Sequence, residues 1–532
     1  MSFFLTLLWA TVALRKEYWG SEAHLFGNEQ NLQSRPDFIT KVDYGGLHPW
    51  ESPIEDHQSN KRKQKYRRES TLSVYDYKRD NPTQPIRIFF YTDFVSSILH
   101  FTDKENFDNL TDTYVLDGEE EENVQIQVLI NEILPQSAEF WSKAIGVIPV
   151  QGNLRINAPA KEGDFQSPKA QTVYSNCPMV EEHSETGVPD TDIIIYLYAT
   201  TKCANLSETE SVVGRSSITG YTLGIPCELD QFDRPIGGIL DFCLDSLETN
   251  RKGIVPDYIK KNALTSVARQ IGNILGVHPA LYRFFRHPKT GKPLTPRPFI
   301  EEQVQCVDGS TSTLQMPACN TLKVGQTAKG VKFYQVVTPT VSTIMQNHFG
   351  CSYVEGARLE NQHYDNRGVN CYGSEWESRW FEGELMAPMH TSSTHQLSPL
   401  TLALLEDSGW YVANYSASKT LSFGHLAGCR FLHDDCIGRG DTVPDYMDGF
   451  ICNRTLSLTE FELSTAPRSC DPYNTHKSFC DLVDFDDPFF GNINSKPSEK
   501  YSHFSNSVSV KCYMTSHIFT CICLTKYYCL LP

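Results

Sequence analysis

Three polar side chains stand at the spacing that a metal-dependent hydrolase uses on its central helix. Arg269, Gln270 and Asn273 occupy positions i, i+1 and i+4 of one stretch, so Arg269 and Asn273 share a helix face. Helices of the His-Glu-x-x-His type place two zinc-binding imidazoles and a general-base carboxylate at these positions. A guanidinium and two amides supply hydrogen bonds but neither good zinc ligands nor a base. The stretch therefore has the frame of a metal-binding helix without its ligands.

The residues around this triplet predict an amphipathic helix over 258–275. Apolar residues recur at three- and four-residue spacing, which is typical of one buried stripe: Leu264, Val267, Ala268, Ile271, Ile274 and Leu275. Gly276 follows the last of them, at the place where helices commonly end.

Other elements are predicted from shorter patterns. Apolar, β-branched runs indicate strands at 86–91, 192–198 and 236–243, and a helix is expected around 124–145, bent or broken by Pro135. This order indicates an α/β N-terminal half. Loops are expected from about 277 to 345, helices at 341–349 and 398–410, and little periodicity beyond Cys429.

Composition narrows the class of protein. A chain of 532 residues has room for two to four domains. Its formal net charge of −17 argues against nucleic-acid binding, and the acidic run 117–122 is predicted to be a solvated loop. After the N-terminal apolar run, no segment reaches the roughly 18 apolar residues that a membrane span needs, so no transmembrane helix is expected.

The cysteines indicate an oxidising compartment. The chain has 17, none before Cys177 and nine after residue 428; scattered cysteines of this kind are typical of disulfides rather than zinc ribbons. The odd number leaves one thiol unpaired or reflects a truncated or misjoined end. An apolar run at 3–14, without a basic n-region, is suited to a signal peptide. Glycosylation sequons agree with secretion: Asn109, Asn205, Asn414 and Asn453.

Several separated blocks follow one another in the order of a known family: 229–236, 271–276, 294–297, 359–362, 374–377, 384–386 and 402–411. Over roughly residues 84–480 the chain resembles the leishmanolysin-like (invadolysin-type) peptidases of the M8 metzincin family. The resemblance implies an α+β, metzincin-type zinc-protease fold. Such a fold has an N-terminal α/β subdomain, an active-site helix, a methionine turn and a cysteine-rich, disulfide-held C-terminal domain.

On this resemblance the chain divides into five regions. They are a signal peptide at 1–16, a pro-segment-like or linker region at 17–83, an N-terminal subdomain at 84–276, a second catalytic subdomain at 277–428 and a truncated cysteine-rich region at 429–532. The basic cluster 61–68 is equally consistent with a processing site and with a solvated linker.

Carried over residue by residue, the family's active site is substituted. The zinc-ligand positions fall on Arg269, Asn273 and Glu375, the general-base position on Gln270, and the methionine turn on Met386. The family's pro-segment cysteine has no counterpart before residue 177.

A zinc ion is disfavoured at these residues. A guanidinium about 4 Å from Zn²⁺ costs roughly 8 kcal/mol at an effective dielectric near 20, and one carboxylate recovers about half of that. We therefore predict that Arg269 and Glu375 form an ion pair in place of the metal, with hydrogen bonds from Gln270 and Asn273. Loss of the general base alone typically removes about 10²–10⁴ in rate.

Other ligand sets are weighed against this prediction. A replacement metal site could combine His278, His363 and Glu375, although core or surface histidines are the favoured interpretation. Cys371 is predicted to form a disulfide rather than to act as a ligand or nucleophile.

The resemblance implies zinc endopeptidases that are secreted or held at the cell surface, several linked to adhesion or migration. For this chain the substitutions predict a catalytically inactive homologue without bound zinc, which binds extracellular or cell-surface proteins such as host or matrix proteins. The alternative is an active zinc endopeptidase with an unorthodox ligand set, cleaving extracellular proteins. A third possibility is a locus that yields little functional protein, because the tail 519–532 departs from the family.

Overall fold

The computed structural model describes residues 42–43, 83–96, 118–156, 177–178, 180–200, 222–306, 311–326, 332–360, 375–387, 395–434 and 444–447, and short strands between 468 and 530. The predicted signal peptide, the basic cluster, Asn109, Asn205, Asn453, His363 and Cys371 lie outside the described residues.

A four-stranded sheet forms the base of the N-terminal half. Its strands lie in the order β2 (Ile88–Tyr91), β4 (Ile193–Thr200), β6 (Pro235–Cys243) and β5 (Leu223–Leu229). The first three are parallel, whereas β5 runs antiparallel to β6 and forms the edge. Alternate residues of β4 enter two different hydrophobic clusters, so both faces of the sheet are covered. The three predicted strands are confirmed, and β5 was not predicted.

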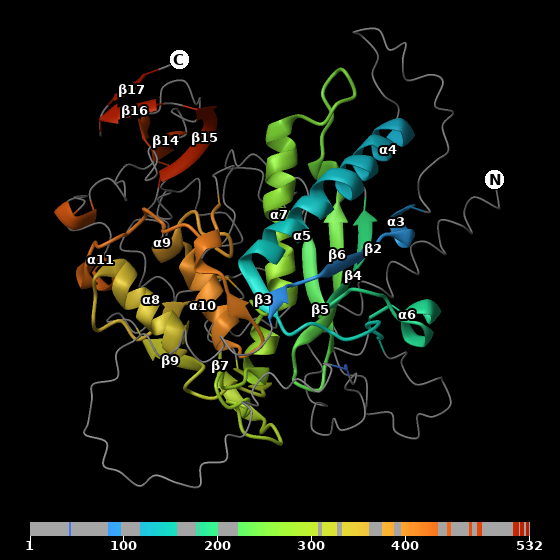
Figure 1. Ribbon diagram of the computed structural model, residues 1–532. Coiled ribbons are helices and arrows are strands. Elements are labelled where there is room, and N and C mark those ends of the chain that lie inside the picture. The colour runs from blue at the N-terminus through green and yellow to red at the C-terminus, as the bar shows by residue number, and fades with distance from the viewer. Residues whose placement is uncertain are drawn as a thin grey trace.

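Helices cover one face of this sheet (Figure 1). Helix α4 (Gly118–Val128) continues through the π-helical turn η3 (Leu129–Ile133) into α5 (Leu134–Ala144), and α5 packs beside α7 (Asp257–Leu275). Pro135 lies at the junction, as expected. The expectation that the acidic run is a loop is wrong, because Glu119 to Glu122 form the first turns of α4. Glutamate is a good helix former and is favoured near the positive N-terminal end.

The second half combines small sheets with two buried helices. Hairpin β7 (Glu302–Gln305) and β8 (Thr311–Leu314) precedes the antiparallel strands β9 (Leu322–Gln326), β10 (Lys332–Val336) and β11 (Ala357–Arg358). The strands β7 to β10 replace part of the expected loop region; they are short and carry little apolar alternation. The predicted helices are confirmed as α8 (Pro339–Phe349) and α10 (Pro399–Asp407).

Smaller elements complete the described chain. They are β1 (Gln84–Pro85), α3 (Asp93–Ser96), β3 (Ile145–Val147), α6 (Glu181–Glu185), α9 (Ser378–Phe381), β12 (Val412–Ala413), α11 (Cys429–His433), β13 (Arg468–Cys470), β14 (His476–Cys480), β15 (Met514–Thr520), β16 (Ile522–Thr525) and β17 (Tyr528–Leu530).

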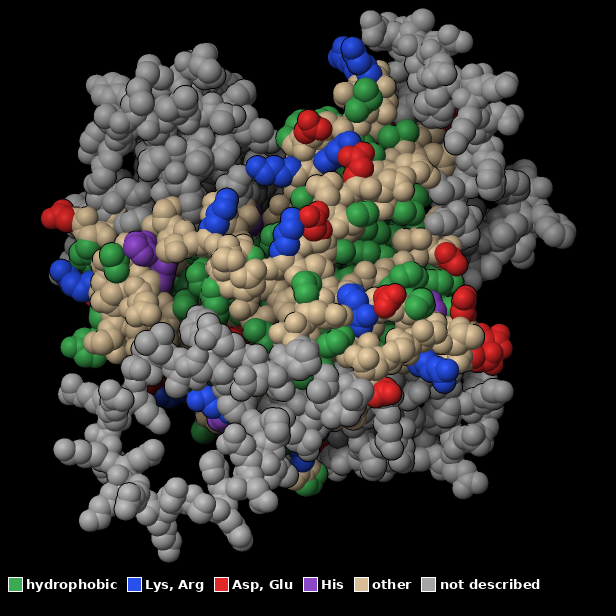
Figure 2. All heavy atoms as spheres, viewed as in Figure 1, with side chains coloured by type: hydrophobic (Ala, Val, Ile, Leu, Met, Phe, Trp, Pro, Cys, Tyr) green, Lys and Arg blue, Asp and Glu red, His purple; other side chains and the backbone are tan. Residues whose placement is uncertain are grey.

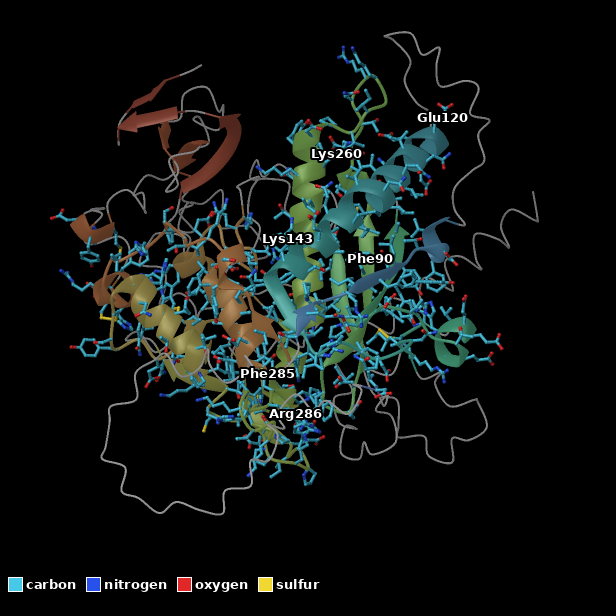
Figure 3. All side chains as sticks on the ribbon, viewed as in Figure 1. Phe90, Glu120, Lys143, Lys260, Phe285 and Arg286 are labelled. Carbon is cyan, nitrogen blue, oxygen red and sulfur yellow. A yellow bond between two sulfur atoms is a disulfide. The ribbon has the colours of Figure 1, made fainter. Side chains whose placement is uncertain are left out.

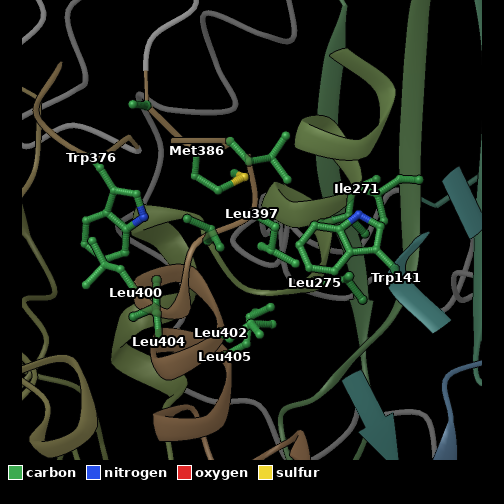
Figure 4. Packing of buried hydrophobic residues seen from close by; sticks show 14 of the residues in the cluster. Trp141, Ile271, Leu275, Trp376, Met386, Leu397, Leu400, Leu402, Leu404 and Leu405 are labelled. Atoms are coloured by element: carbon green, nitrogen blue, oxygen red, sulfur yellow. The ribbon is translucent and has the colours of Figure 1, made fainter. Parts of the chain in front are cut away.

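One hydrophobic core joins both halves. Figure 4 shows Trp141, Ile271 and Leu275 facing side chains of α10 and the turn at Met386. The core continues past residue 428 through Phe431 and Met447. Among the described residues, no helix combines the length and the apolar character that a membrane span requires.

Disulfides tie distant segments to this core. Cys177 is bonded to Cys227 in β5, and Cys351 after α8 is bonded to Cys429 at the start of α11. Cys243 and Cys306 are also disulfide-bonded. Within the described residues Cys319 is a free, exposed thiol. The expectation of disulfides is confirmed.

Candidate functional site

Helix α7 lies close against a methionine-containing turn, and a glycine of the helix allows this close approach. A Cβ atom on Gly272 would lie 2.7 Å from Met386 Sδ and 3.0 Å from Trp141 Cζ2, so only glycine allows this approach. Trp141 also donates its indole N–H to the Ala268 carbonyl at 2.8 Å. Met386 therefore lies directly beneath the helix that carries the substituted triplet.

A buried carboxylate shapes that turn. Glu384 accepts hydrogen bonds from the Met386 amide, from Ser398 Oγ at 2.9 Å and from Thr401 Oγ1 at 2.7 Å. Burial raises its pKa, while these donors oppose the rise. The Trp376 amide donates to the Met386 carbonyl at 3.0 Å. The turn thus fixes the backbone next to residue 375.

Arg269 on α7 and Glu375 form an ion pair. Their side chains are 7% and 17% exposed, so the pair is largely shielded from water. The Glu375 backbone is also fixed, because its carbonyl accepts a hydrogen bond from the Glu360 amide at 2.8 Å. The predicted ion pair is confirmed, and it joins two positions 106 residues apart at the place where α7 meets the Met386 turn.

The two amides do not join this ion pair, and that part of the prediction is wrong. Gln270 Oε1 instead accepts from the Gly224 amide of β5 and from Asn273 Nδ2, both at 2.9 Å. The physical reason is the closeness of β5 and α7: a Cβ on Gly224 would lie 2.3 Å from the Gln270 carbonyl oxygen. Asn273 Oδ1 is buried and has no hydrogen-bond partner among the described residues.

Strand β5 is the part of the site that sequence reasoning missed. It is the edge of the sheet, and an edge strand can accept an added peptide strand through its outward N–H groups. Gly224 gives its N–H to Gln270, and Pro226, the next residue of the same alternation, has none. Gln270 therefore occupies the outward N–H of Gly224. A carboxylate at position 270 could accept the same hydrogen bond.

These residues do not fit a zinc ion. Arg269 stays protonated and carries a positive charge. The Gln270 and Asn273 amides are engaged with each other, and Gln270 also with β5, so Glu375 is left as the single good ligand of the set. Across the described ranges, no group of three His, Cys, Asp or Glu residues is placed to hold a metal.

His278, weighed as a replacement ligand, is a core residue. It is 9% exposed, and its Nδ1 accepts from the Ala280 amide at the start of the 3₁₀ turn η5 (Pro279–Phe284). Burial and then the nearby Arg283 charge lower its pKa from 6.5 to about 4. The favoured interpretation of this histidine is confirmed.

This burial predicts an acid-sensitive fold. The unfolded chain takes up a proton on His278 as the pH falls below about 6.5, whereas the folded chain does so only near pH 4. Stability from this group is therefore present above pH 6.5 and lost on acidification, by about 2 kcal/mol at pH 5. Denaturant unfolding at pH 7.5 and pH 5 should show this loss. The His278→Asn variant keeps a capping oxygen, so its free energy of unfolding should fall by about 2 kcal/mol less between the two pH values. An equal fall in both proteins would contradict the role given to His278.

Asn414 is the one sequon asparagine among the described residues. It is exposed at the start of the 3₁₀ turn Tyr415–Ala417. Its Nδ2 donates to the Lys143 carbonyl at 2.8 Å, and its Oδ1 accepts from Ser416 Oγ at 2.6 Å. Glycosylation there stays a prediction.

Comparisons with known proteins agree on one family. The leishmanolysin (peptidase M8) family model matches residues 59–495. A leishmanolysin-like peptidase of Drosophila pseudoobscura pseudoobscura is 27% identical over 411 residues, covering 69% of this chain and 53% of the relative. One of Caenorhabditis elegans is 34% identical over 351 residues, covering 59% and 50%. The ciliated left-right organizer metallopeptidase of Xenopus laevis is 26% identical over 328 residues, covering 61% and 38%.

The chain thus spans about half the length of the leishmanolysin-like relatives that it matches. The family match nevertheless covers most of the sequence, including α7, the Met386 turn and the segment that carries Glu375. The chain belongs to the leishmanolysin family of peptidases.

Proposed function

We propose that this chain is a family member that has lost peptidase activity and acts by binding other proteins. The ion pair between Arg269 and Glu375 is the observation that carries the proposal. It puts a permanent positive charge at a ligand position of a family whose chemistry depends on a divalent cation. Such a charge repels the ion, and a single carboxylate offsets only part of that repulsion.

The general-base position supports the same proposal. An amide cannot accept a proton from water, and Gln270 is instead committed to the edge strand through Gly224. The surrounding frame is kept nonetheless: Gly272, Met386 and the Glu384 hydrogen bonds hold the helix and the turn together. A scaffold of this kind can bind without hydrolysing.

The proposed partners are extracellular or cell-surface proteins, including host or matrix proteins. The disulfides favour an oxidising compartment, and the family acts on proteins. We further propose that the protein is secreted or held at the cell surface, with glycans at its sequons.

Metal analysis and peptide cleavage test the proposal together. The purified chain, dialysed after exposure to zinc, should hold far less than one zinc per molecule and should cleave a mixed peptide library no faster in the absence of chelator than in its presence. A Caenorhabditis elegans leishmanolysin-like peptidase handled in parallel provides the active comparison. One tightly bound zinc per chain with chelator-sensitive cleavage would instead establish the alternative, a zinc endopeptidase with an unorthodox ligand set.

A further inference from the structure

A strongly basic segment follows α7, at the end of the helix away from Lys260 (Figure 3). Residues 278–300 contain no Asp or Glu. They carry five Lys or Arg residues: Arg283, Arg286, Lys289, Lys292 and Arg297. In a chain with a net charge of −17, such a segment is a local reversal of sign. Where Figure 2 draws side chains in colour, acidic and basic groups are intermingled.

Two of these arginines share one carboxylate. Arg286 Nε and Arg297 Nη2 both lie 2.6 Å from Asp233 Oδ2, and Asp233 is itself buried. The Arg297 guanidinium carbon is also 5.3 Å from the centre of the Phe299 ring. The segment is thereby anchored to the turn before β6.

Among the described residues, Arg283 has no such partner. It is 3% exposed, and its Nε and Nη2 atoms have no hydrogen-bond partner in that part of the chain, where it also makes no ion pair. Its guanidinium carbon lies 5.1 Å from the Phe284 ring centre and 5.8 Å from that of Phe299. Since Arg297 lies within 6 Å of the same two rings, both cations flank one aromatic pair. A buried guanidinium without an anion is costly, and binding of an anion would offset that cost.

The loop beyond Arg283 presents two further cations on a fixed backbone. The His287 amide donates to the Lys292 carbonyl, and Arg286 Nη1 donates to the Gly291 carbonyl, both at 2.9 Å. The Lys289 amide donates to His287 Nδ1 at 3.1 Å. Lys289 and Lys292 are exposed on this loop. A loop that is already ordered loses little entropy when it binds a ligand.

We propose that the segment from Arg283 to Arg297, the basic loop, binds a sulfated polysaccharide. Guanidinium and ammonium groups recognise sulfate through charge-assisted hydrogen bonds. Lys289 and Lys292 on the loop and Arg297 beside the aromatic pair are exposed, so they offer several cations to the repeated sulfates of a linear polyanion. The disulfides favour an oxidising compartment. Nucleic acid and the anionic leaflet of the plasma membrane are found on the cytoplasmic side of that membrane. An extracellular protein does not meet them there, whereas it does meet sulfated polysaccharides. This inference rests on the extracellular location proposed above, but not on the Arg269–Glu375 pair.

Calorimetry with a heparin-derived octasaccharide at low ionic strength tests the exposed part of the loop. The full chain should bind, with an affinity that falls as salt is added. Replacing Lys289 and Lys292 with alanine should weaken binding about tenfold or more. The control replaces the exposed Lys252 and Lys261, which lie outside the loop, and should leave the affinity within about twofold. Equal effects of the two pairs, or binding to phosphatidylserine vesicles but not to the octasaccharide, would overturn the proposal.

Arg283 is tested by thermal unfolding with and without the octasaccharide. In its absence the Arg283→Met variant should unfold at the same temperature as the original chain or higher, because a buried cation has been replaced by an apolar side chain of similar length. The rise in unfolding temperature on adding the octasaccharide should be reduced. If the octasaccharide raises the unfolding temperature of the variant as much as that of the original chain, Arg283 has no role in binding. If the variant does not fold, the calorimetric comparison of the two lysine pairs tests the proposal.

Discussion

Replacing Glu375 with leucine should lower the free energy of unfolding by about 3–5 kcal/mol, because it leaves the Arg269 guanidinium buried without its carboxylate. Arg269 is 7% exposed and cannot become neutral by losing a proton. The Arg269→Met variant should be less affected, since Glu375 is 17% exposed and can accept a proton. Urea unfolding at pH 7.5 measures both changes.

The double variant, Arg269→Met with Glu375→Leu, provides the decisive comparison. Replacing both partners of a buried ion pair by apolar groups is often neutral or stabilising, so the double variant should recover most of the loss caused by Glu375→Leu alone. Additive losses would mean that the two side chains are not coupled. Coupling would also mean that the pair itself holds α7 to the segment before the Met386 turn, where the family places a metal.

The sequence predicted the elements whose signal is local. Helix α7 follows from its apolar period and its final glycine, and β4 from an uninterrupted β-branched run. The ion pair could be predicted because the resemblance aligned two distant positions and their charges are opposite. Elementary electrostatics then favoured attraction between them.

The features that were missed depend on long-range contacts. Strand β5 contains Gly224 and Pro226, residues that normally argue against a strand. It is stabilised by pairing with β6 and by its approach to α7. The hydrogen bond from Gly224 to Gln270 spans 46 residues and involves a backbone amide, so residue types give no sign of it. Glu384 is similar, because its partners Ser398 and Thr401 are ordinary loop and helix residues until the chain folds.

Four substitutions should restore a zinc site: Arg269→His, Gln270→Glu, Asn273→His and Glu375→His. Residues 269 and 273 share one face of α7, and residue 375 already reaches that face, since its present side chain contacts Arg269. Three imidazoles are a sufficient protein ligand set for a catalytic zinc, with water in the fourth position. We expect one zinc per chain, measured after dialysis against metal-free buffer, where the unsubstituted chain retains far less.

The same variant separates metal binding from catalysis. A matched control that keeps Gln270 and carries the other three substitutions should bind zinc equally well, because residue 270 is not a ligand. It should hydrolyse peptides about 10²–10⁴ more slowly than the fourfold variant, in which Gln270→Glu supplies the general base. A carboxylate at that position can still accept a hydrogen bond from the Gly224 amide, so the contact with β5 is preserved.

Two outcomes would contradict the prediction. If the fourfold variant folds with an unchanged unfolding transition yet binds no zinc, the backbone around α7 no longer suits a metal site, and differences beyond these four side chains prevent zinc binding. If it binds zinc but hydrolyses nothing, the closed edge of β5 at Pro226 becomes the next position to change.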